Sequence, residues 1–143
     1  MQYVPEEEYR DNIMHMVKMA KQKKISIVLI TPPPVDEVQL QATNAKKGKS
    51  ITLDRLNNRT LRYVNVIKDL GTSIDVPVVD LWSGLYGASE KRTEYLSDGL
   101  HLNAKGNELL FKLVISCIES DLPEWMPEHL PLDHPHWTWF QSN

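Results

Sequence analysis

Two short apolar runs, one in each half of the chain, are the feature that most limits what this sequence can fold into. Residues 25–30 read ISIVLI and residues 76–81 read VPVVDL. Runs of this kind, rich in β-branched residues and without alternation, are typical of strands buried on both faces of a parallel sheet. The prolines at 32–34 end the first run, because proline cannot donate to a strand ladder. We therefore predict parallel strands near residues 25–31 and 76–80.

Three helices are predicted around these strands, near residues 5–23, 53–70 and 103–119. The first opens with Pro5 and three glutamates and closes with lysines, so its charges complement the helix dipole. The second lies between the two strands, which implies a right-handed parallel crossover. The third follows Asn103, a favourable N-cap residue. Residues 35–51 lack periodicity and are expected to form a long loop, and residues 82–94 a connection with room for a short helical turn.

Composition and charge exclude several classes of function. The chain has 143 residues, about one domain, and a net charge of −3, which provides no basic surface for nucleic acid. The sequence shows neither a membrane-spanning run nor a signal peptide. A single cysteine excludes an internal disulfide framework and favours a reducing compartment, so we expect a cytoplasmic location. The one cysteine, Cys117, lies in an apolar helical pattern and is interpreted as a packing residue.

The predicted sheet is small for a parallel α/β protein. Two parallel strands leave two apolar edges without partners, and parallel sheets usually have more strands, covered on both faces. We therefore expect residues 1–121 to be the later part of a larger α/β domain. Residues 122–143, rich in proline, tryptophan and histidine, are expected to form an irregular tail.

The segment SDGLHLNAKG at residues 97–106 carries the clearest chemical signal. It places Asp98 three residues before His101, in a short turn that leads into a helix. A carboxylate there can accept a hydrogen bond from the histidine Nδ1–H, which leaves Nε2 free to take a proton. This arrangement is half of a hydrolytic triad.

The same segment resembles the last conserved block of the SGNH (GDSL) esterase/lipase family, and in particular its isoamyl-acetate-hydrolysing branch, which includes plant members. Residues 4–12, 30–34 and 79–82 are similar to other segments of that branch, in the same order. The resemblance implies a three-layer α/β/α, flavodoxin-like fold, present here in part. It also implies hydrolysis of small or acetate esters through a serine acyl-enzyme, without metal or organic cofactor. Asp98 would orient the imidazole, and His101 would act as general base and then general acid.

The sequence departs from the family pattern at the nucleophile. No serine of the chain stands in a Gly-Asp-Ser block or a Gly-x-Ser-x-Gly elbow, and the family's glycine and asparagine blocks are absent. We expect a truncated gene model, an alternative transcript product or a degenerate paralogue, inactive as a separate chain. The alternative is a non-catalytic interaction protein that reuses the half-domain and buries its open strand edge against a partner.

Other candidate residues have simpler interpretations. Ser97 is next to Asp98, but adjacent side chains point apart, so we do not expect it to reach His101 as a nucleophile. Asp80, at the end of the second strand, is interpreted as a structural hydrogen-bond acceptor.

The tail offers two further alternatives. One group of tail residues could form a metal cluster: His129, Asp133, His134 and His136. We favour solvated loop histidines instead, because prolines separate these residues. The three tail tryptophans could line an ester-binding groove, but we favour packing on the domain surface for Trp125, Trp137 and Trp139.

Overall fold

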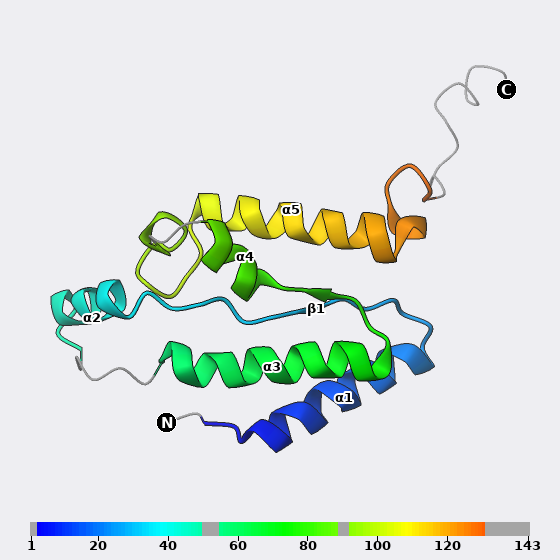
Figure 1. Cartoon of the computed structure of the whole chain (residues 1–143), viewed down its shortest axis with the longest axis horizontal. Coiled ribbons are helices and arrows are strands. Elements are labelled where there is room, and N and C mark those ends of the chain that lie inside the picture. The colour runs from blue at the N-terminus through cyan, green and yellow to red at the C-terminus, as the bar shows by residue number, and fades with distance from the viewer. Residues whose placement is uncertain (1–2, 50–54, 89–91, 131–143) are drawn as a thin grey trace, which may run out of the picture.

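The computed structural model describes residues 3–49, 55–88 and 92–130 (Figure 1). Within these ranges two strands are accompanied by five α-helices and two short 3-10 helices. In chain order the elements are α1 (Glu6–Gln22), β1 (Leu29–Ile30), α2 (Glu37–Lys46), α3 (Asn57–Ile74), β2 (Val78–Val79), α4 (Leu81–Ala88), η1 (Arg92–Glu94), α5 (Ala104–Asp121) and η2 (Pro123–Trp125).

The elements form three layers, with the two strands in the middle (Figure 1). Strand β1 pairs with β2 in parallel, Leu29 opposite Val78. Helices α1 and α3 cover one face, and α4 and α5 cover the other. The core is divided accordingly into one cluster of Val17, Leu29, Ile67, Leu70 and Val76, and another of Leu81, Leu85 and Tyr95. The predicted α/β class and parallel pairing are confirmed.

Both strands are shorter than predicted. The ladder bonds run from the Leu29 N–H to the Pro77 carbonyl at 2.9 Å and from the Thr31 N–H to the Val79 carbonyl at 3.0 Å. Pro77 has no N–H to donate in return, which limits the ladder at that end. The apolar runs at 25–31 and 76–80 therefore contribute only residues 29–30 and 78–79 to regular strand.

The prediction of a loop over residues 35–51 was wrong, because helix α2 lies within it. Asp36 caps this helix, its Oδ1 accepting the Gln39 N–H at 2.9 Å. Only Leu40 of α2 is buried, so the helical period is weak in the sequence. The spacing Asp-x-x-Gln, a variant of the capping box, was the available signal.

Helix α3 lies four residues further along the chain than predicted. Residues 53 and 54 lie outside the described ranges, and the helix begins at Asn57 and runs past Gly71 to Ile74. Gly71 does not end it: a Cβ at this position would collide with the Val78 side chain, so glycine allows the helix to approach β2. The helix ends at Asp75, whose φ of 51° is left-handed.

Two other segments agree with the sequence more closely. Helix α1 occupies most of the predicted range 5–23, with glutamates in its first turn and Lys21 in its last. Residues 82–94 are more helical than expected, because they hold most of α4 and all of η1. After Leu122 the chain forms η2 and turns as far as Leu130, and the rest of the predicted tail lies outside the described residues.

Helix α5 begins as predicted, with Asn103 as its N-cap. The Asn103 Oδ1 accepts the Gly106 N–H at 3.0 Å. Cys117 lies in the buried face of this helix, and burial raises the pKa of its thiol, which supports its interpretation as a packing residue.

Replacing Asn103 with alanine is expected to lower the free energy of unfolding by about 1 kcal/mol, the usual cost of losing an N-cap. The substitution also removes the hydrogen bond from the Asn103 Nδ2 to the Glu94 carbonyl, 2.8 Å long. Urea unfolding of the variant would measure the loss. Asn107→Ala, at an exposed position one turn later, is the control and should cost no more than about 0.5 kcal/mol. Equal losses in the two variants would contradict the capping role.

Candidate functional site

The Asp98–His101 segment forms the tip of a small hairpin between η1 and α5. Leu96 and Leu102 form an antiparallel bridge at its base. The Ser97 N–H donates to the His101 carbonyl at 2.8 Å, which closes the turn. Gly99 has a φ of 88°, in the left-handed region that favours glycine. Leu96, only 2% exposed, anchors the hairpin in the interior.

The structure brings Asp98 and His101 into direct contact. The His101 Nδ1 lies 2.9 Å from Asp98 Oδ2 and 3.1 Å from Oδ1. Asp98 Oδ1 also accepts the backbone N–H groups of Leu100 and His101, at 3.1 and 3.0 Å. The carboxylate therefore holds both the backbone of the turn and the ring that the turn presents.

The surroundings of Asp98 keep its carboxyl group ionised. The backbone N–H of His101, the imidazole and the N–H of Leu100 lower the pKa of Asp98 to about 2, against the opposing effect of burial. An ionised carboxylate only accepts hydrogen bonds, so the neutral imidazole carries its proton on Nδ1. The His101 side chain is 71% exposed, whereas that of Asp98 is 23% exposed. The ring is thus fixed on its Nδ1 side, and Nε2 remains for proton exchange.

Acid should remove the stability that ionised Asp98 contributes. Its pKa of about 2 lies below the ordinary 3.8, so the folded state binds this proton less tightly than the unfolded chain does. The contribution is therefore present above pH 3.8 and is lost as the pH falls toward about 2. Urea unfolding at about pH 5 and about pH 2.5 would test this, with Asp98→Asn as reference. The stability difference between the two proteins should shrink in acid, and a constant difference would contradict the assignment.

Ser97 is engaged within the turn. Its Oγ donates to the His101 carbonyl oxygen at 3.1 Å, so the hydroxyl is directed to the backbone of His101 rather than to its ring. This contact supports the interpretation that Ser97 is not the nucleophile.

Asp80 holds the carboxyl ends of the two strands together. Its Oδ1 accepts from the hydroxyl of Thr31 at 3.3 Å and from the Ser83 N–H at 3.1 Å, and its Oδ2 lies 2.5 Å from Lys68 Nζ. Burial alone would raise the pKa of Asp80, but the hydrogen bonds from Lys68 and Ser83 outweigh it and lower the pKa. Thr31 is 1% exposed and also accepts the Trp82 N–H at 3.0 Å. Asp80 is therefore a structural acceptor, as the sequence indicated.

The tail histidines can be placed only in part. His129 is exposed, and its Nδ1 donates to the Pro123 carbonyl at 2.7 Å. Asp133, His134 and His136 lie outside the described residues, as do Trp137 and Trp139. The described part of the chain contains no group of three or more histidine, cysteine or acidic side chains suited to a metal ion. It also contains no helix both long and apolar enough to cross a membrane.

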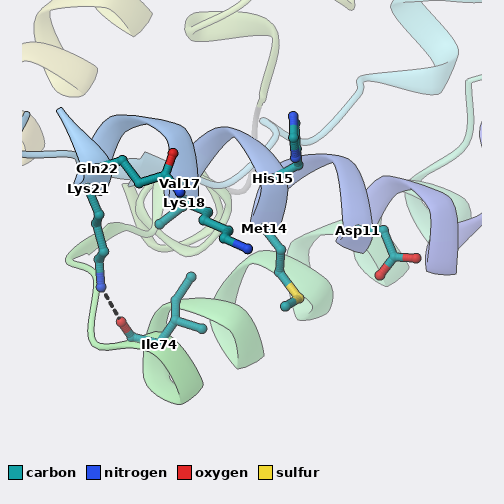
Figure 2. Close-up of a pocket in the computed structure, with 8 residues that line it drawn as sticks. All are labelled: Asp11, Met14, His15, Val17, Lys18, Lys21, Gln22 and Ile74. Atoms are coloured by element: carbon teal, nitrogen blue, oxygen red, sulfur yellow. Dashed lines mark hydrogen bonds between the residues drawn. The ribbon is translucent and has the colours of Figure 1, made fainter.

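A pocket of about 610 Å³ lies elsewhere, along α1 and the end of α3 (Figure 2). Met14, Val17 and Ile74 form much of its apolar lining, and Lys21 Nζ donates to the Ile74 carbonyl at 2.7 Å. Neither Asp98 nor His101 lines it. The candidate site is therefore the exposed hairpin tip rather than this pocket.

Comparison with known proteins identifies the class. Residues 1–109 match the GDSL-like lipase/acylhydrolase family. The chain belongs to this family. It is 36% identical over 94% of its length to a GDSL esterase/lipase of Arabidopsis thaliana, and 36% identical over 95% to the isoamyl acetate-hydrolyzing esterase 1 homolog of Homo sapiens. It spans 57% and 53% of those two proteins, about half the length of each.

Solved structures agree with the fold. A lipase/acylhydrolase from Enterococcus faecalis superposes with a TM-score of 0.62 and 26% identity, over 82% of this chain and 53% of that one. A GDSL-like lipase from Bacteroides thetaiotaomicron, 19% identical, superposes with a TM-score of 0.61 over 82% of this chain and 54% of its own. The described layers are thus those of the GDSL lipase/acylhydrolase fold.

Sequence reasoning missed the residues that support the hairpin from α2. The Asp36 N–H donates to the Gly99 carbonyl at 2.9 Å, and Gln39 Nε2 lies 3.4 Å from the Ser97 carbonyl. The capping pattern at Asp36 predicts a helix start, but nothing in the sequence shows what that helix packs against.

Proposed function

We propose that this chain carries the proton-transfer half of a serine carboxylic ester hydrolase site, with Asp98 and His101 in the roles that the family resemblance implies. The 2.9 Å contact between His101 Nδ1 and Asp98 Oδ2 is the observation that carries the proposal. Small esters, in particular acetates, are the proposed substrates, because the human relative is named as an isoamyl acetate-hydrolysing esterase homolog.

The geometry suits a two-step acyl transfer. A serine oxygen attacks the acyl carbon of the ester while its proton moves to Nε2 of His101. Ionised Asp98 stabilises the imidazolium, which then gives the proton to the departing alcohol. Water attacks the acyl-enzyme in the second step, with His101 again as base, and releases the acid and the free serine. No step requires a metal or an organic cofactor.

The proposed nucleophile is not among the serines of this chain. None of them stands in a Gly-Asp-Ser block, and Ser97, the nearest to His101 in sequence, is bonded within its own turn. We therefore propose that the nucleophile and the oxyanion donors come from a segment of the kind found in the unmatched half of the relatives. The 143-residue chain by itself should lack serine-type esterase activity.

A comparison of the chain with a fusion protein tests this proposal. In the fusion, the N-terminus of this chain is joined to a segment of the human relative, namely the part of that protein that this chain does not match. The chain alone should neither react with a fluorescent fluorophosphonate nor hydrolyse p-nitrophenyl acetate above a His101→Ala background. The fusion should do both. Labelling of the chain alone that depends on His101 would show that one of its own serines is the nucleophile, and a folded but inactive fusion would refute the proposed role of the pair.

The alternative is a non-catalytic interaction protein, favoured by the open edge of β1. In the described part of the chain β1 has one neighbour, β2, and Ile30 is 41% exposed. Such a surface suits pairing with a partner strand. A stable, homogeneous chain without turnover, shown by light scattering, would favour this alternative. Aggregation of the isolated chain would count against it.

A further inference from the structure

Asn57, the first residue of α3, forms three hydrogen bonds with residues at the start of α2. Its side-chain Oδ1 accepts the Val35 N–H at 2.8 Å, and its Nδ2 donates to the Val35 carbonyl at 2.7 Å. Its own backbone N–H donates to Glu37 Oε1 at 2.8 Å. Val35 is 3% exposed, so its backbone groups have little access to water and depend on this amide. Asn57 therefore fixes the chain entering α2.

The same segment is bonded on its other side to the hairpin. The Asp36 N–H donates to the Gly99 carbonyl at 2.9 Å. Gly99 lies so close to α2 that a Cβ there would meet the backbone N of Leu40, and would lie 2.6 Å from the Asp36 carbonyl oxygen. Gly99 stands between Asp98 and His101 in the sequence, so whatever places Gly99 also places the pair.

The hairpin tip needs support of this kind. The His101 side chain is 71% exposed, so core packing does little to hold the ring. Proton transfer to a fixed serine requires the imidazole within a fraction of an ångström of its working position. Asp98 fixes the ring relative to the turn, but both the conformation of the turn, in which Gly99 has a φ of 88°, and its position depend on its contacts with α2.

We propose that Asn57 is a positioning residue for His101, acting through Val35, Asp36 and Gly99 to hold the hairpin tip in place. The proposal rests on the proposed function, because it is the assignment of His101 as the base that gives this support a catalytic purpose. The hydrogen bonds of Asn57 go to Val35 and Glu37 rather than to His101. It acts by holding the start of α2, against which the turn is built.

Nitrogen NMR of the 143-residue chain tests the proposal without any substrate. At mildly alkaline pH the chemical shifts of the two His101 ring nitrogens show which of them carries the proton. In the wild-type chain Nδ1 should be the protonated nitrogen, because it faces ionised Asp98. In Asn57→Ala this preference should weaken toward a mixture of both tautomers. The midpoint of the Asp98 carboxyl titration should rise from about 2 toward 3.8.

Asn58→Ala is the matched control, since it removes the same amide one position along the same helix turn, where the side chain is exposed. It should leave the His101 nitrogens and the Asp98 midpoint unchanged. If Asn57→Ala does not fold, Glu37→Ala provides a second test, because it removes the carboxylate that accepts the Asn57 backbone N–H. It should shift the His101 tautomer and the Asp98 midpoint in the same direction, but by less. Folded Asn57→Ala, or folded Glu37→Ala in its place, with wild-type values would overturn the proposal.

The result is independent of the test of the proposed function. The fusion could be inactive while the wild-type chain still has its proton on His101 Nδ1. That result would refute the esterase role and leave the structural support intact. An active fusion, together with an Asn57→Ala chain that keeps the wild-type tautomer, would refute the positioning role alone.

Discussion

Replacing Asp98 with asparagine in the fusion protein is expected to lower kcat for p-nitrophenyl acetate by about 10⁴-fold, the size of effect known for the orienting aspartate of serine hydrolases. The asparagine keeps the shape of the side chain but loses its charge. The asparagine amide can donate to His101 Nδ1, which favours the tautomer with the proton on Nε2. A protonated Nε2 cannot accept the serine proton. The substitution also removes the negative charge that stabilises the imidazolium. Steady-state kinetics should show the loss in kcat with little change in KM, since Asp98 contacts no part of the substrate in the proposed mechanism.

Ser97→Ala is the matched control for this experiment, because it alters the adjacent residue of the same turn. It removes the hydroxyl that donates to the His101 carbonyl at 3.1 Å but leaves the carboxylate and the ring in place. We expect activity within a few-fold of the unmodified fusion. A loss of less than about tenfold for Asp98→Asn would contradict the orienting role. A loss of fluorophosphonate labelling in Ser97→Ala would instead identify Ser97 as the nucleophile.

The sequence predicted the parts of the site that depend on neighbouring residues. Asp98 and His101 are three positions apart, and their contact is made within the turn that joins them. The cap at Asn103 is equally local, because its acceptor and the Gly106 N–H lie within one helical turn. Residue type and spacing suffice for such contacts, since the local backbone conformation brings the groups together.

The parts that could not be predicted depend on pairings between distant segments. The two apolar runs predicted strands of seven and five residues, but only two residues of each strand pair, Leu29 with Val78 and Ile30 with Val79. Helix α2 buries only Leu40, so its amphipathic signal is weak. Asn57 bonds to Val35 across 22 positions, and no local pattern marks that partnership. The contacts of α2 and Asn57 support the hairpin, so the pair of side chains could be predicted from the sequence but the scaffold that holds them could not.

Gly99→Ala is expected to lower the free energy of unfolding by about 3 kcal/mol, from two costs that act together. The φ of 88° at this position is strained for any residue with a Cβ. The added methyl group would also collide with the backbone of α2, at the Leu40 N and the Asp36 carbonyl oxygen. Leu40 is 7% exposed, so α2 cannot withdraw without disturbing its buried contact. Urea unfolding at neutral pH would measure the loss.

Gly48→Ala separates the two costs. Gly48 also has a left-handed φ, 63°, but among the described residues no atom beyond its two chain neighbours lies within 4 Å of where its Cβ would be. This control should therefore cost only the backbone strain, about 1 kcal/mol. The excess of Gly99→Ala over Gly48→Ala measures the close approach of the hairpin to α2, the contact through which Asn57 is proposed to act. Equal losses at the two glycines would mean that α2 yields to the new methyl group. A start of α2 that yields so easily could not hold His101 in place, and the positioning role of Asn57 would lose its physical basis.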